Sequence, residues 1–361
     1  MADDFGYHID HHGSLARPAE LLTARSANDP VALAAAQEQA VVAAAHAQRR
    51  LGLSAISDGQ FRRSSFESVA YDSIDGFTIV SGMQPLADAA GIAWSRRRAA
   101  PAQPVARGRL AQAEVAPVLA TVDRHVFVQL PSPGYLAALG SPLASWADVD
   151  AVRAAGEALA PVLRAEIEAL AADGVGYVAL GNPLYPPLLT LAGRERLAAV
   201  LAVDAVLQAM LAADRAVFTG LNVPANFRIG LDLTDAGALP TTERGYDAKA
   251  LDTLLDGNPF HRLCVDFPAD PIRRLPVEQV PLGIVLSLGV VDVTDPTLET
   301  VDSLLERIDP VFGLRGEPDT AIATNGGFAS IADQPTAGAE LQTEKLRLVE
   351  MVARYYWGNE I

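Results

Sequence analysis

Residues 148–183, DVDAVRAAGEALAPVLRAEIEALAADGVGYVALGNP, contain a helical segment followed by an apolar one, and this unit indicates the fold. The alanine- and leucine-rich stretch up to Gly174 predicts a long helix, because glycine commonly follows the last turn of a helix. The run at 175–181 predicts a buried strand, which Asn182 and Pro183 end. The unit is therefore typical of a protein in which helices and parallel strands alternate.

The same alternation continues in both directions along the chain. A helix is expected over 29–52, with Asp29 as its N-cap, Pro30 in its first turn and Gly52 at its end. Eight strands are expected, near 7–13 and over 53–59, 125–133, 175–183, 227–235, 261–268, 282–293 and 320–328. This order predicts an α/β protein, a single (β/α)8 barrel over 1–361 with an irregular insertion or lid at about 64–122. A doubly wound open sheet stays as the alternative, although no GxGxxG motif opens a helix after a strand.

Composition excludes several classes of partner. The formal net charge is −16, which argues against nucleic acid and against anionic membrane surfaces. Cys264 is the only cysteine, so neither an intrachain disulfide nor a cysteine-rich zinc site is expected. We see no signal peptide and no apolar run long enough to span a membrane. We therefore expect a cytoplasmic protein acting on a small molecule, and leave open a homo-oligomer.

Polar residues follow the predicted strands, where a barrel builds its active site. Each of them also has an ordinary explanation, since strand ends lead into turns that favour such residues. Asp232 and Asp266 stand out because they lie within apolar runs, where a carboxylate needs a partner. The candidate site residues are His11, His12, Gly13, Ser14, Arg17, Asp58, Gln60, Arg62, Ser132, Asn182, Tyr185, Asp232, Asp266 and Asn325.

Several segments together resemble the catalytic barrel of cobalamin-independent methionine synthase. They are HHGSLARP at 11–18, SDGQFRRSSF at 57–66, LPSPGYL at 130–136, LGVVDVTDPTLETVDSLLERI at 288–308 and NGGFAS at 325–330. The resemblance extends over nearly the whole chain and implies a barrel of the methionine synthase and uroporphyrinogen decarboxylase type.

The zinc site that the resemblance implies is altered here. In that family a zinc ion activates a substrate thiol, held by a His and a Cys after strand five, a Glu after strand six and a Cys after strand eight. These positions fall on Asp232 and Thr234, on Asp266 and on Gly326. Zinc prefers nitrogen and sulfur ligands, so we expect no zinc cofactor. A weak Mg²⁺ or Mn²⁺ site at Asp232 and Asp266 is left open.

The amino-acid anchors of the family are changed as well. Its substrate-binding Glu falls on Gln60, and its acidic pair after strand four falls on Gly181 and Asn182. The groups suited to an anion remain: the backbone and hydroxyl of Gly13 and Ser14, and the guanidinium groups of Arg17 and Arg62.

These residues suggest an enzyme that keeps the barrel but not the methionine synthase reaction. We expect metal-independent acid–base chemistry, of the lyase, isomerase or hydrolase type, on a small anionic or oxygenated substrate. His11 or His12 is the expected acid or base, Asp232 and Asp266 a carboxylate pair, and Asn182 and Asn325 carbonyl-polarising groups. Two alternatives are a methyl or alkyl transferase with an altered or absent metal, and a non-catalytic binding protein.

Overall fold

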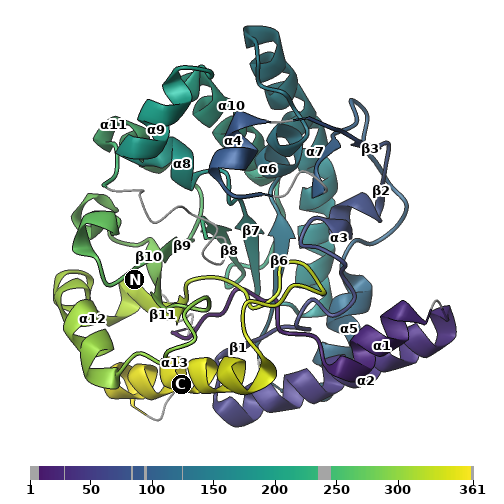
Figure 1. Cartoon of the computed structure of the whole chain (residues 1–361), viewed down its shortest axis with the longest axis vertical. Coiled ribbons are helices and arrows are strands. Elements are labelled where there is room, and N and C mark those ends of the chain that lie inside the picture. The colour runs from purple at the N-terminus through teal and green to yellow at the C-terminus, as the bar shows by residue number, and fades with distance from the viewer. Residues whose placement is uncertain are drawn as a thin grey trace.

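A computed structural model of the chain describes residues 8–27, 29–82, 84–92, 96–123, 125–234 and 245–358. It contains one curled parallel sheet of seven strands in the order β1-β6-β7-β8-β9-β10-β11 (Figure 1). The predicted α/β barrel class is therefore confirmed. The strands are β1 (Ala55–Ile56), β6 (His125–Pro131), β7 (Tyr177–Gly181), β8 (Arg228–Asp232), β9 (Arg262–Asp266), β10 (Val285–Val291) and β11 (Thr320–Thr324).

The predicted first strand is only a short paired segment. Ile9 forms a single parallel bridge with Ile322 of β11, and Asp10 N donates to Ile322 O at 2.9 Å. On its other side Ile9 N donates to Ser54 Oγ at 3.1 Å, just before β1. The N-terminal segment therefore lies between the two edge strands, where an eighth strand would stand, and leads His12 to the barrel mouth.

Helices surround the sheet in Figure 1 and cover its apolar outer face. Two of them match the expected ends closely: α2 is capped by the Asp29 side chain and ends at Gly52, and α7 begins after Ser145 and ends at Gly174. The helices are α1 (Ala19–Ser26), α2 (Pro30–Leu51), α3 (Ser68–Tyr71), α4 (Pro85–Ala89), α5 (Gln112–Thr121), α6 (Pro133–Leu139), α7 (Trp146–Asp173), α8 (Pro186–Leu189), α9 (Leu191–Ala198), α10 (Val203–Arg215), α11 (Ala248–Leu255), α12 (Val301–Arg315) and α13 (Ala339–Trp357).

The helical stretch between β7 and β8 is divided into α9 and α10. Ala202 leaves the helical conformation with ψ of 74°, and the chain bends by 113° at this break. Within the described residues no single helix has the length and apolar composition to cross a membrane. Only the bent pair Leu191–Ala198 and Val203–Phe218 meets that test, when its two parts are taken together.

The segment at 64–122, expected to be irregular, contains short regular elements. Two antiparallel pairs form, β2 (Ile74–Asp75) with β5 (Val105–Ala106) and β3 (Thr78–Ile79) with β4 (Arg98–Ala99), together with the helices α3, α4 and α5. Each strand spans two residues, which is too short to leave a readable alternation in the sequence.

The interior of the barrel contains both apolar and polar side chains. On β6, Phe127 and Gln129 point inward while Val126, Val128 and Leu130 pack against helices, as the alternation along a barrel strand requires. Asp10 and Arg262 form a buried ion pair in this interior, with Arg262 Nε 2.7 Å from Asp10 Oδ2. Charged side chains therefore lie inside the barrel, below the mouth at which the strands end.

Candidate active site

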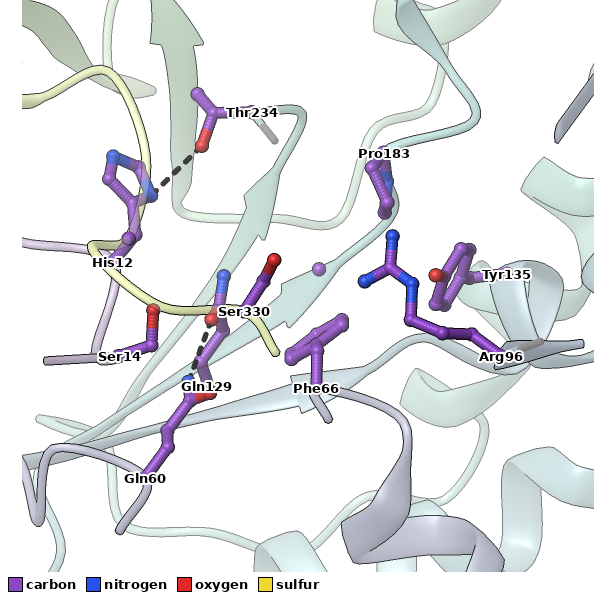
Figure 2. Close-up of a pocket in the computed structure, with 12 residues that line it drawn as sticks. His12, Ser14, Gln60, Phe66, Arg96, Gln129, Tyr135, Pro183, Thr234 and Ser330 are labelled. Atoms are coloured by element: carbon purple, nitrogen blue, oxygen red, sulfur yellow. Dashed lines mark hydrogen bonds between the residues drawn. The ribbon is translucent and has the colours of Figure 1, made fainter. Parts of the chain in front are cut away.

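The carboxyl ends of the strands form a cavity that collects residues from distant parts of the chain. His12 and Ser14 come from the N-terminal segment, Gln129 from β6 and Thr234 from just beyond β8 (Figure 2). The cavity is lined by His12, Ser14, Gln60, Phe66, Arg96, Gln129, Tyr135, Gly181, Pro183, Thr234, Gly327 and Ser330. Three of the predicted site residues, His12, Ser14 and Gln60, therefore line it, and we call it the first cavity.

His12 and Asp232 form a buried ion pair at the wall of the first cavity. His12 Nδ1 lies 2.7 Å from Asp232 Oδ2, and the two side chains are 5% and 1% exposed. Thr234 completes the group, because its Oγ1 lies 3.1 Å from His12 Nδ1 and donates to Asp232 Oδ1 at 2.8 Å. Residues separated by 220 positions thus meet in one buried cluster.

The partners of His12 determine where its protons lie. His12 Nε2 is 2.7 Å from the carbonyl oxygen of Thr324, which can only accept, so Nε2 carries a hydrogen. Nδ1 faces the Asp232 carboxylate and needs a hydrogen as well. Burial alone would lower the pKa of His12, but the charge and hydrogen bond of Asp232 outweigh it, with help from Asp10 and Thr324, and the pKa is raised. Both ring nitrogens thus face acceptors, an arrangement that favours the imidazolium form of His12.

A chain of amides orients this pair. Gln129 Nε2 donates to Asp232 Oδ2 at 2.5 Å, and Gln60 Nε2 donates to Gln129 Oε1 at 3.1 Å. Gln60 has φ of 56°, a left-handed conformation that costs a non-glycine residue energy, and Asp58 Oδ1 accepts its backbone N–H at 2.9 Å. Asp58 thus positions Gln60 rather than facing the cavity, and burial raises the pKa of its carboxyl.

Small residues allow close packing beside this chain. Gly13 has φ of 82°, and a Cβ there would lie 3.0 Å from Gln60 Nε2. A Cβ at Gly327 would lie 1.9 Å from Ser14 Oγ, so no larger residue fits there without a shift. Ser14 Oγ accepts the backbone N–H of Ala329 at 3.3 Å. Gly13 therefore supports the site through its backbone shape, while Ser14 stands at the cavity wall.

The opposite wall is built by residues that the sequence did not reveal. Arg96 reaches into the first cavity between Pro183, Tyr135 and Phe66 (Figure 2). Behind it Glu67, fully buried, accepts the Tyr135 hydroxyl at 2.5 Å and lies 3.5 Å from Arg96 Nη1. The first cavity therefore has a guanidinium group on one side and the His12 imidazolium on the other.

The two arginines expected to bind an anion are engaged elsewhere. Arg17, 6% exposed, donates through both terminal nitrogens to four backbone carbonyls, at 2.6–3.3 Å. Arg62 pairs with Glu38 of α2 at 2.6 Å, on the outside of the barrel. Neither lines the first cavity, because Arg17 binds backbone carbonyl oxygens and Arg62 binds a side chain of α2.

Ser132, Asn182 and Tyr185 converge on a buried aspartate instead of a cavity. Asp214 of α10, fully buried, accepts Tyr185 Oη at 2.7 Å and Asn182 Nδ2 at 3.1 Å. Ser132 caps α6 and also bonds to Asp214. These three residues therefore join the ends of β6 and β7 to α10, and Asp214 is the partner that sequence reasoning missed.

His11 lies inside the barrel below the site. It is buried edge-on against Phe127, and burial together with the charge of His12 lowers the pKa of His11 to about 4. His11 is therefore neutral near pH 7, which leaves His12 as the charged member of the pair.

Asp266 and Asn325 line a second cavity of about 220 Å³ beside the first, with Thr234 in the wall of both. Burial raises the pKa of Asp266 to about 6, although Arg273 and Arg307 oppose the shift and Asp292 adds to it. The expected carboxylate pair of Asp232 and Asp266 finds no support, because Asp232 bonds to His12, Gln129 and Thr234 and lines a different cavity.

The positions that the resemblance assigns to zinc ligands hold Asp232, Thr234, Asp266 and Gly326, which offer no nitrogen or sulfur ligand. The Asp232 carboxylate already accepts hydrogen bonds from His12, Gln129 and Thr234, and no thiolate stands at Thr234 or Gly326. In the described part of the chain no group of three or more His, Cys, Asp or Glu side chains is placed to hold a metal ion. A Mg²⁺ or Mn²⁺ site shared by Asp232 and Asp266 finds no geometric support either.

Comparison with solved structures agrees with the fold class, a barrel of the methionine synthase type. No protein-family model matches the chain, and no curated protein sequence matches it. A B12-independent methionine synthase from Shewanella sp. W3-18-1, solved with selenomethionine, is 14% identical over 97% of each chain, with a TM-score of 0.72. A candidate vitamin-B12-independent methionine synthase from Listeria monocytogenes is 17% identical over 98% of each chain, with a TM-score of 0.67. At this identity the likeness shows the shared fold, as the sequence resemblance predicted.

Proposed function

We propose that this chain is an enzyme that carries out acid–base chemistry, of the lyase, isomerase or hydrolase type, on a small anionic substrate in the first cavity. His12 and Asp232 are the proton-transferring pair in this proposal, and Arg96 binds the anionic group. The transferase alternative is supported by the likeness of fold alone, since Asp232 and Thr234, at two of the zinc-ligand positions, bond to each other and to His12.

The observation that carries the proposal is the buried pair of His12 and Asp232, 2.7 Å apart at the cavity wall. Burying two charges is costly unless both find partners, and each of these has them: Thr324 for the ring, Thr234 and Gln129 for the carboxylate. A barrel needs no such pair for stability, since apolar residues would pack the same space without the desolvation cost.

The geometry supports transfer of the proton on His12 Nδ1. Thr234 Oγ1 lies next to that nitrogen and borders the first cavity. When its hydrogen turns from Asp232 Oδ1 to a bound substrate, the hydroxyl can accept the Nδ1 proton and pass its own to the substrate. As negative charge develops on a substrate oxygen, the imidazolium donates and becomes neutral imidazole. The neutral ring then takes up the proton that the reaction releases, so the pair returns to its starting state.

Arg96 supports the choice of an anionic substrate. A guanidinium group can donate two parallel hydrogen bonds to a carboxylate or phosphate. The contact with Glu67 limits the orientations of the Arg96 guanidinium. With the imidazolium on the facing wall, a bound anion lies between two fixed positive groups, and formation of further negative charge is favoured there.

The test combines ligand screening with two variants. Wild-type protein is screened against small carboxylates and phosphates by thermal shift, and binders are followed by NMR for turnover. Arg96→Gln should lose the thermal shift, while Arg62→Gln, its matched control on the barrel exterior, should keep it. Asp232→Asn should lose turnover and retain weaker binding, because Arg96 still holds the anion while His12 becomes neutral.

Each other outcome contradicts a definite part of the proposal. Binding without turnover in the wild type identifies a non-catalytic binding protein. Equal binding in Arg96→Gln removes Arg96 as the anion site, and unchanged turnover in Asp232→Asn removes the proton-transferring pair.

A further inference from the structure

Phe66 is held at the mouth of the barrel by the loop that follows β11. Its backbone N–H donates to the carbonyl oxygen of Ser330 at 2.9 Å, and its neighbour Ser65 forms an antiparallel bridge with Ile331. From this position the Phe66 side chain lines the first cavity. The segments after β1 and β11 together thus fix one wall of the cavity before any substrate arrives.

The end of β7 leaves room for the Phe66 ring. A Cβ at Gly181 would lie 2.7 Å from Phe66 Cζ, closer than non-bonded carbon atoms pack. The ring therefore covers the end of β7, and the Tyr135 ring packs beside it with 6.0 Å between the centroids. Phe66 is only 8% exposed, so a polar group placed against its ring finds little water and no hydrogen-bond partner there.

Phe66 and Pro183 make the surroundings of Arg96 apolar. Figure 2 shows the Arg96 guanidinium group between these two side chains, close to Tyr135. The Tyr135 hydroxyl donates to Glu67 at 2.5 Å, so its hydrogen is used within the protein. A carbon atom next to an acid group on Arg96 therefore meets the Phe66 ring and Pro183 rather than a hydrogen-bonding side chain.

The facing wall of the first cavity carries the polar groups. His12, Ser14, Gln129 and Thr234 line it, and Ser330 lies between the two walls in Figure 2. The proton-transferring pair of the proposed function is on this polar wall, so the reacting oxygen of a substrate has to reach it. The first cavity is also smaller than the second, which favours a short carbon skeleton.

We propose that the substrate is a short organic acid whose reacting oxygen is separated from the acid group by at least one apolar carbon, and that Phe66 selects it. This inference rests on the function proposed above for the same cavity. An oxygen on the carbon next to the acid group would face Phe66 and Pro183 and lose its hydrogen bonds to water. An oxygen one carbon further along reaches the wall of His12 and Thr234, where hydrogen-bonding groups replace that water.

The experiment uses isothermal titration calorimetry on the full chain with 3-hydroxypropanoate and with both enantiomers of 2-hydroxypropanoate, isomers of equal charge. We expect the 3-hydroxy acid to bind about tenfold or more tightly than either enantiomer, the effect of burying a hydroxyl without a partner. Phe66→His should narrow this difference, because a polar ring can bond to a hydroxyl beside the acid group. Phe312→His, the same substitution in the stack of Phe312 on Tyr356 between α12 and α13, should keep it.

The outcomes separate this inference from the proposed function. Equal affinities, tighter binding of a 2-hydroxy acid, or a full preference retained in Phe66→His would overturn the inference alone. So would a protein that binds other anions through Arg96 but neither hydroxy acid. If no small anion binds the wild type, the proposed function fails together with the inference. The comparison of isomers in the wild type decides the substrate class even if Phe66→His does not fold.

Discussion

Replacing Asp232 by asparagine tests the buried pair through stability alone, without knowledge of the substrate. The new Oδ1 still accepts from Thr234, whose N and Oγ1 lie 2.9 and 2.8 Å from that oxygen in the wild type. The new amide nitrogen replaces Oδ2, which accepted from both His12 and Gln129. His12 can adapt by losing its Nδ1 proton and accepting from the amide, but Gln129 Nε2 then has no acceptor.

The expected magnitude follows from these contacts. A buried donor without an acceptor costs about 1–3 kcal/mol. Breaking a buried ion pair costs about 3–5 kcal/mol when the remaining charge stays buried. Near neutral pH His12 escapes most of the second cost by becoming neutral, so we expect Asp232→Asn to lose about 2–4 kcal/mol of unfolding free energy.

The pH dependence provides the sharper test. In the wild type the pKa of His12 is raised, so its contribution to stability is full below about 6.5, its unfolded value, and is lost as the pH rises through the folded value. In Asp232→Asn burial without the carboxylate lowers the pKa of His12, and the sign reverses: lower pH then destabilises. The deficit of the variant should therefore grow as the pH falls from about 8 to about 5.5.

Urea unfolding of both proteins at these two pH values measures the deficit, with Asp302→Asn as an exposed control. A deficit below about 1 kcal/mol, or one that is the same at both pH values, would refute the imidazolium assignment.

Three further predictions concern neighbouring residues. Asp266→Asn should raise the unfolding free energy by about 1–3 kcal/mol at pH 7 and add nothing below pH 4, because the pKa of Asp266 is raised to about 6 and its ionised form opposes folding; urea titrations at both pH values check this. Tyr185→Phe should cost about 1–3 kcal/mol through the lost bond to Asp214 but leave ligand binding intact, as thermal unfolding with and without ligand would show. Gln60→Gly should relieve about 1 kcal/mol of backbone strain yet weaken ligand binding, and unchanged binding would remove Gln60 from the site.

The sequence predicted the fold well because its signals are local. Capping and glycine stops placed α2 and α7 within two residues of their ends, and apolar runs placed β6 to β11. The strand predicted near 7–13 is the exception. That segment is paired with β11 by a single bridge at Ile9, which requires no strand alternation in the sequence.

The clearest signal for a site residue in the sequence is a polar side chain within an apolar strand. Asp232 and Asp266 were singled out on that ground, and Gln129 in HVFVQLP carries the same signal, so it was open to discovery. Arg17 and Asn182 bond within the protein, because a polar residue at a strand end serves backbone carbonyls or the buried Asp214 as readily as a ligand. Arg96 gave no signal, because its role depends on how the segment 64–122 folds over the mouth.

The central claim is that a proton on His12, and not a metal ion, supplies the positive charge at Asp232. The most direct measurement is the ¹⁵N chemical shift of the two His12 ring nitrogens at neutral pH, in protein saturated with zinc and in protein without it. The account predicts two protonated ring nitrogens in both wild-type samples. In Asp232→Asn it predicts one, because only Nε2 stays protonated. A zinc-dependent shift of Nδ1, with near-stoichiometric zinc retained by the wild type and lost from Asp232→Ala, would contradict it.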